Sequence, residues 1–196
     1  AMTSVAESRS RPRDPGARPQ GRLLVLTGDP GAGKSTHCRR VAQAAREAGM
    51  VVRGVVATDE PVAGGAWRWL EDLRGGERIL LGRMATPEQI AAGEPRWALD
   101  DAALDRCSRI LAEAGPADLL VIDEVGPLEL LQGRGAIEGV RAALSGRYGA
   151  ALVVVRPWLV ERFAELFPAP RPEVVDVQEP DALGRLLAAV VARGPA

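Results

Sequence analysis

The stretch "GDPGAGKST", residues 28–36, holds the only lysine among the 25 lysine and arginine residues of the chain. Residues 28–35 fit the pattern G-x-x-x-x-G-K-S, which binds phosphate when it lies between a strand and a helix. The aliphatic run Leu23–Thr27 precedes the pattern, and residues 34–48 follow it with small and apolar side chains at helical spacing. The sequence therefore predicts a strand, a phosphate-binding loop (P-loop) and a helix, in that order.

The residue types of this loop suit a triphosphate. Its glycines let the backbone wrap round the phosphates, so that N–H groups point at their oxygens, and the positive end of the following helix adds attraction. The lysine is expected to reach the β- and γ-phosphates as a compact charge, which the wide planar fork of arginine cannot replace. The serine hydroxyl is expected to join the shell of a Mg²⁺ ion. The predicted nucleotide-binding residues are Gly28, Asp29, Pro30, Gly31, Ala32, Gly33, Lys34, Ser35 and Thr36.

A second motif, "LLVIDEVGPLEL" at residues 119–130, supplies acidic residues. Asp123 closes an aliphatic run, where a carboxylate is costly without a partner; Mg²⁺ and its phosphates would be that partner, and a helix N-cap is the alternative. Glu124 is expected to orient or deprotonate an attacking water, with a surface carboxylate as the alternative. Arg156 follows another aliphatic run and is a candidate internal arginine finger, or else a solvated surface residue.

The rest of the chain alternates aliphatic runs with helical patterns, which favours an α/β fold with a mostly parallel sheet, helices on both faces and an inserted β-hairpin. Ligands of such sheets bind at the carboxyl ends of the strands. Further strands are expected at Val51–Ala57, Leu119–Asp123, Ala151–Val155 and Val174–Val177, a hairpin at 67–83 with its turn at Gly75 and Gly76, and helices starting at Asp100 or Asp101, at about 136, near Pro157 and at about 181.

Length and composition narrow the class of protein. Residues 1–20 are rich in Ser, Arg, Pro and Gly and are expected to be a disordered tail, which leaves 21–196 as a single domain. The net charge of −1 argues against a nucleic-acid binder with a basic face. No apolar run approaches the roughly 18–20 residues of a membrane span. Cys38 and Cys107 form no C-x-x-C pair and are expected to be reduced thiols in a cytoplasmic protein.

Together the two motifs resemble the small P-loop nucleoside-triphosphatases of the thermostable, or cancer-related, type. That family pairs G-x-P-G-x-G-K-[ST]-T with D-E-[IV]-G-x-[ML]-E-L, so that Pro30, Thr36, Gly126 and Glu129 match as well. The resemblance covers about residues 22–192. It implies a P-loop fold and Mg²⁺-dependent hydrolysis of ATP, GTP and other nucleoside triphosphates to diphosphate and phosphate, with weak choice of base.

The chain departs from the family pattern in "TDEPVAGGAWRW", residues 58–69. Trp67 stands where the family has an arginine, Arg68 follows one place later, and Val62 stands at the family's other arginine. The tryptophans Trp67, Trp69 and Trp97 are expected to pack, with stacking on a base as the alternative. His37 is expected to pack or cap.

Three functional hypotheses remain. A hydrolase is favoured by Glu124 and by the family resemblance. The alternatives are a small-molecule or nucleotide kinase, in which Arg156 and Arg162 would belong to a lid over the phosphates, and a nucleotide-gated partner-binding protein. Arg162 and Arg171 are weaker candidates than Arg156 for the internal arginine finger. Because the chain contains no asparagine, it cannot carry the N-K-x-D element of guanine-specific switches.

Overall fold

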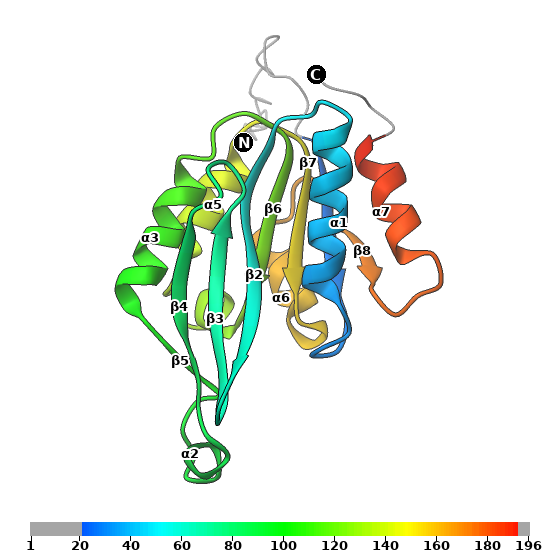
Figure 1. Ribbon diagram of the computed structural model, residues 1–196. Helices are drawn as coiled ribbons and strands as arrows, with labels where there is room; N and C mark the ends of the chain where they lie inside the picture. The colour runs from blue at the N-terminus through cyan, green and yellow to red at the C-terminus, as the bar shows by residue number, and fades with distance from the viewer. Residues whose placement is uncertain (1–20, 192–196) are drawn as a thin grey trace, which may run out of the picture.

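The computed structural model describes residues 21–191, so the predicted tail at 1–20 and the last five residues lie outside the described part of the chain. The described residues form one eight-stranded sheet with the order β5-β4-β3-β2-β6-β7-β1-β8. Helices cover both of its faces (Figure 1). The strands are β1 (Arg22–Thr27), β2 (Val52–Val62), β3 (Gly65–Asp72), β4 (Arg78–Met84), β5 (Trp97–Leu99), β6 (Ala117–Val125), β7 (Tyr148–Val155) and β8 (Glu173–Asp176).

The helices divide between the two faces of the sheet. Helices α1 and α7 pack on one face, and α3, α5 and α6 pack on the other (Figure 1). The helices are α1 (Lys34–Glu47), α2 (Pro87–Ala91), α3 (Asp101–Ala112), α4 (Pro127–Leu130), α5 (Ile137–Ser145), α6 (Val160–Leu166) and α7 (Ala182–Val191), with a 3₁₀ turn at η1 (Pro157–Leu159). The predicted two-sided α/β architecture is confirmed.

The centre of the sheet is parallel, as the aliphatic runs predict. Strand β1 pairs in parallel with β7 and β8, and β6 pairs in parallel with β7 and β2. Successive residues of β1 serve opposite faces: Leu24 packs in the core under α1 and α7, and Val25 packs in the core under α3 and α5. A strand that is buried on both faces has no polar side, which explains the unbroken aliphatic run.

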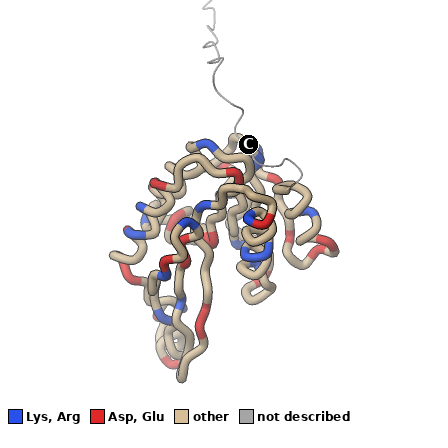
Figure 2. The backbone as a smooth tube through the Cα atoms, turned by 45° about the horizontal axis from the view of Figure 1, so that its top comes forward, with Lys and Arg blue, Asp and Glu red and all other residues tan. Residues whose placement is uncertain are grey.

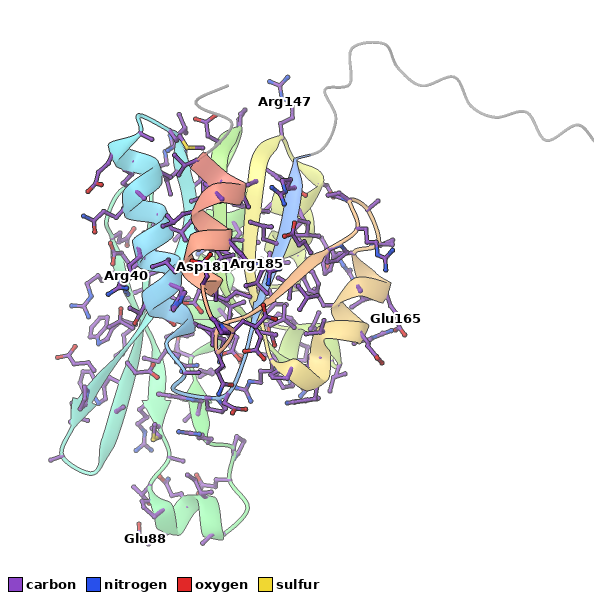
Figure 3. All side chains as sticks on the ribbon, turned by 90° about the vertical axis from the view of Figure 1, so that its right-hand side faces the viewer. Arg40, Glu88, Arg147, Glu165, Asp181 and Arg185 are labelled. Atoms are coloured by element: carbon purple, nitrogen blue, oxygen red, sulfur yellow. The ribbon has the colours of Figure 1, made fainter. Side chains whose placement is uncertain are left out.

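The predicted hairpin is present but belongs to a longer antiparallel extension of the same sheet. Strand β2 runs on to Val62, five residues beyond the predicted end, and pairs with β3, which pairs with β4. The P-loop lies at the carboxyl ends of the parallel strands. The β2–β3 turn and α2 extend beyond that end of the sheet (Figure 1). Glu88 of α2 and Arg147, which directly precedes β7, accordingly lie at opposite ends of the molecule (Figure 3).

Three short elements were not predicted: α2, β5 and α4. The signal for α2 is readable, because Thr86 and Gln89 form a capping box before the proline start of the helix. Of the two candidate caps of α3, Asp100 is the cap, and its Oδ1 accepts from the N–H of Ala103 at 2.7 Å. Strand β6 does not end at Asp123 as predicted but continues to Val125.

The surface of the described part mixes charges of both signs. Acidic and basic residues are interspersed over most of the backbone (Figure 2). Within residues 21–191, no helix combines the length and the apolar character that a membrane crossing requires.

Strand β2 approaches β6 so closely that Gly54 has no room for a side chain. Its φ is +105°, and an added Cβ would lie 1.9 Å from the carbonyl oxygen of Val121. We therefore expect Gly54→Ala to lower the free energy of unfolding by more than about 2 kcal/mol in denaturant titrations. Gly75→Ala is the control, because its Cβ would find its nearest neighbour at 3.6 Å. A wild-type midpoint for Gly54→Ala would contradict the close approach.

Candidate active site

The loop at residues 28–33 joins β1 to α1 at the carboxyl end of β1. Gly28, Gly31 and Gly33 have φ of 135°, 79° and 94°, values that residues with a side chain rarely adopt. The N–H of Ala32 closes the loop on the carbonyl of Asp29 at 3.2 Å. All nine predicted nucleotide-binding residues thus lie on this loop and the first turn of α1.

Lys34 folds back over this loop. Its Nζ donates to the carbonyl oxygens of Gly28 and Asp29, both at 2.7 Å. The ammonium therefore lies inside the loop, where the phosphates of a nucleotide are predicted to bind. His37 Nδ1 lies 3.1 Å from the carbonyl oxygen of Gly33, and the side chain is half-buried; it does not cap α1, which has no side-chain cap.

Asp123 is buried beside the loop. Its side chain is 3% exposed, its Oδ2 accepts from the N–H of Ala57 at 3.1 Å, and it hydrogen-bonds to the side chain of Ser35. Burial raises the pKa of Asp123 to about 6, although the bonds from Ser35 and Ala57 act in the opposite direction. Asp123 is not a helix cap, because it lies within β6 and the cap of α4 is Gly126. The structure brings together the two predicted metal ligands, Ser35 and Asp123.

Glu124 lies between two arginines. Its Oε1 accepts from Arg156 Nε at 2.6 Å, and its Oε2 lies 3.6 Å from Arg68 Nη1. The Glu124 side chain is 21% exposed, so it is not the solvated surface carboxylate that was the alternative. The structure therefore brings Arg156 to Glu124.

Arg68 is the residue that the sequence hypotheses left without a role. It forms two bonds of 2.8 Å to the carboxylate of Asp59, and its guanidinium lies over the ring of Trp97 at 4.1 Å. Burial opposes the charge of Arg68, but the bond to Asp59 and the neighbouring carboxylates raise its pKa above the ordinary value. Adjacent residues of a strand point to opposite faces of the sheet, so the side chain of Trp67 cannot take the position of Arg68 beside Asp59 and Glu124.

A readable signal for Arg68 exists. Asp59 and Arg68 stand directly opposite each other in the β2–β3 hairpin, and opposite charges at such positions attract. The turn at Ala63 and Gly64 sets the pairing of the two strands, so counting residues away from that turn gives the pair and the face on which Arg68 lies.

The carboxylate of Glu129, in the second motif, accepts hydrogen bonds from the backbone. It is 8% exposed, and its two oxygens accept from the N–H groups of Gly126 and Ala136, at 3.1 and 3.3 Å. Burial raises its pKa, and these two bonds work against that rise. Glu129 thereby ties the start of α4 to the start of α5 and fixes the segment that follows Glu124.

The remaining candidate residues make no ion pair with Glu124. Arg162 on α6 donates to the carbonyl of Leu130 and pairs with Glu165, and Arg171 is exposed. Trp69 lies under the guanidinium of Arg78 at 4.7 Å. Trp97 packs against Arg68 rather than standing open to a base.

Comparison with known proteins assigns the chain to a family. Residues 23–179 match the family described as NTPase. The chain belongs to this NTPase family. It is 32% identical over 110 residues to the nucleoside-triphosphatase THEP1 of Methanothermobacter thermautotrophicus, a match that covers 55% of this chain and 62% of the relative, less than two thirds of its length. It is 32% identical over 133 residues to the THEP1 of Methanopyrus kandleri, covering 67% of this chain and 72% of the relative.

Solved structures of NTPase relatives share the fold. The solution structure of a human cancer-related nucleoside triphosphatase matches with a TM-score of 0.65 and 24% identity, covering 88% of this chain and 97% of that one. The crystal structure of THEP1 from Aquifex aeolicus matches with a TM-score of 0.55 and 16% identity, covering 86% and 99%. The predicted fold and family are confirmed.

The predicted phosphate contact of Lys34 can be tested by substitution. Lys34→Ala should weaken triphosphate binding by a few kcal/mol, because charge-assisted bonds to the β- and γ-phosphates are lost. Lys34→Arg should fail as well, because the fork does not fit the loop. The control is Arg40→Ala, at an exposed position of the same helix (Figure 3). Near-normal affinity and turnover of Lys34→Arg would contradict the assignment.

Proposed function

We propose that this chain hydrolyses nucleoside triphosphates to nucleoside diphosphate and phosphate with Mg²⁺, using Lys34, Ser35, Asp123, Glu124 and Arg156. The observation that carries the proposal is the buried Asp123 bonded to Ser35, with Glu124 next to it in the chain and held by two arginines. Membership of the NTPase family and the THEP1 relatives support the reaction type.

Phosphate binding follows from the present contacts of Lys34. Its ammonium donates to two loop carbonyls, and phosphate oxygens would be stronger acceptors at the same place. Backbone N–H groups of the loop and of the start of α1 would hold the remaining oxygens.

Ser35 and Asp123 fit a Mg²⁺ ion, because a hydroxyl and a carboxylate are oxygen ligands of the kind that Mg²⁺ prefers. The raised pKa of Asp123 supports this role, since a bound cation would favour the charged carboxylate that burial disfavours. Among the described residues, no group of three or more acidic, histidine or cysteine side chains could hold a metal ion. Mg²⁺ commonly binds through one or two carboxylates together with phosphates and water, and when bound it neutralises the charge of the phosphates.

Glu124 is proposed to take the proton of the attacking water. In the described structure one of its oxygens is engaged by Arg156 Nε. A bound γ-phosphate would compete for that guanidinium, so Arg156 would stabilise the phosphate charge and leave the Glu124 oxygen open to water. Arg68 would keep the second oxygen in place, because it is itself held by Asp59.

The substrate is proposed to be ATP, GTP or another nucleoside triphosphate, with weak choice of base.

We also propose a cytoplasmic location. Cys38 and Cys107 support it, because they are buried free thiols suited to a reducing compartment.

Asp123→Asn should raise the Mg²⁺ concentration needed for half-maximal turnover, because it removes one negative charge from the ion's surroundings. Asp105→Asn, at an exposed position on α3, is the control and should leave the Mg²⁺ dependence as it is. An unchanged Mg²⁺ dependence in Asp123→Asn would remove Asp123 from the metal site.

Glu124→Gln tests the hydrolytic role. Glutamine keeps the shape of glutamate but cannot accept a proton from water at neutral pH, so hydrolysis should fall by roughly 10²–10⁴-fold while triphosphate binding stays within a few-fold. Phosphate release without an added acceptor and nucleotide affinity are the two measurements. Glu138→Gln, at an exposed position of α5, is the matched control.

The same assays separate the alternatives. Wild-type turnover that requires an added hydroxyl compound would replace the hydrolase with a kinase. Hydrolysis by Glu124→Gln at the wild-type rate would remove Glu124 from the chemistry.

A further inference from the structure

A cavity of about 240 Å³ opens beside Glu124, on the sheet face that α3 and α5 cover. Its walls come from β2, β3, β4, β5, β6, α3, α4 and α5, and the apolar side chains that β2, β3, β4, β6 and α3 contribute all belong to the buried core of that face. The largest of these side chains are Val55, Leu70, Leu81, Leu104, Leu111 and Ile122, none more than 8% exposed. The cavity therefore extends from the candidate active site into the hydrophobic core.

The volume of this cavity indicates a ligand. Protein interiors are close-packed, with few voids larger than a water molecule. An engineered apolar cavity of about 150 Å³ stays dry and binds benzene. The present cavity is larger than that and smaller than the roughly 300 Å³ at which sites for drug-sized molecules begin, so it fits a single ring or a branched chain of similar size.

The charged side chains that line the cavity decide which polar group the ligand carries. Arg68 and Arg156 are both paired with Glu124, and Arg68 is paired with Asp59 as well. Asp123 and Glu129 also line the cavity, and their carboxylates accept hydrogen bonds from backbone N–H groups. An ionised ligand would face both signs of charge at once. Arg96 also lines the cavity, but it is exposed, so solvent screens its charge. A neutral hydroxyl can donate to the carboxylate or accept from a guanidinium without disturbing these pairs.

We propose that this cavity binds a small neutral molecule with an aromatic or branched apolar body and one hydroxyl, and that the hydroxyl faces Glu124. The cavity would be a second ligand site, separate from the P-loop. One consequence rests on the proposed function: the hydroxyl would stand where Glu124 is expected to hold the attacking water, so an occupied cavity would slow hydrolysis.

Calorimetric titration of the full chain with p-cresol tests the site. We expect one molecule to bind per chain, several-fold more tightly than toluene, which lacks the hydroxyl, and more tightly than 4-methylbenzoate, which carries a charge instead. No binding of p-cresol, or equal or tighter binding of either comparison compound, would overturn the proposal.

Cys107 offers a matched pair of variants. Its side chain lines the cavity and is 5% exposed. Cys107→Phe should fill the cavity and abolish p-cresol binding, whereas Cys107→Ala should keep it open and retain binding. Should Cys107→Phe fail to fold, Val140→Leu adds a smaller group to the same wall and should weaken binding. Wild-type affinity in a folded filling variant would place p-cresol elsewhere and overturn the proposal.

A nucleobase is the competing occupant. We expect p-cresol to bind equally well with ADP or with inorganic tripolyphosphate on the P-loop. Displacement of p-cresol by ADP but not by tripolyphosphate would make the cavity a base pocket and overturn the proposal.

Turnover gives the last measurement. Saturating p-cresol should lower phosphate release by the wild type and by Cys107→Ala but not by Cys107→Phe. Binding without inhibition would overturn the placement of the hydroxyl at Glu124. Absence of hydrolysis without p-cresol would instead be a failure of the proposed function, and the calorimetric result would stand by itself.

Discussion

The carboxylate of Asp123 is the constraint on which the arrangement of this site depends. A carboxylate with 3% exposure must be compensated, because an uncompensated charge in the interior is far more costly than one in water. Its partners come from two other elements: the N–H of Ala57 on β2 and the side chain of Ser35 on α1. Satisfying this one group therefore fixes β2, β6 and the start of the P-loop helix relative to each other.

A second group of charges extends that arrangement across the sheet. Asp59 and Arg68 lie on the part of the β2–β3 extension that runs past the parallel core, and from there Arg68 reaches Glu124. Arg156, at the end of β7, reaches the same carboxylate from the other side. The antiparallel extension therefore contributes to the site, because it supplies Arg68, a cation that no strand of the parallel core supplies. Partial exposure of these groups keeps their net contribution to folding small, so their arrangement is better explained by the chemistry of the site than by stability.

The sequence allowed the centre of the fold to be predicted, because that part is governed by local patterns. The loop at 28–36 has a fixed spacing, and strands buried on both faces read as aliphatic runs. The end of β2 escaped prediction because residues 58–62 are mostly polar and are held as a strand by pairing with β3. Strand β5 is three residues long and is likewise defined by its neighbour. The contacts of Glu124 with Arg68 and Arg156 join residues far apart in sequence, so only the folded sheet could reveal them.

The contacts of Lys34 and Arg68 show why this chain keeps one lysine among so many arginines. Lys34 places a single nitrogen 2.7 Å from two carbonyl oxygens of a tight loop, which a compact ammonium with rotatable donors can do. Arg68 does the opposite: two of its nitrogens make parallel 2.8 Å bonds to the two oxygens of Asp59, while its flat face covers Trp97. That geometry requires a planar fork. An exchange between the two positions would leave the loop with a cation too wide for it and the carboxylate with a cation too small to bridge it, so shape and not charge decides which residue stands at each.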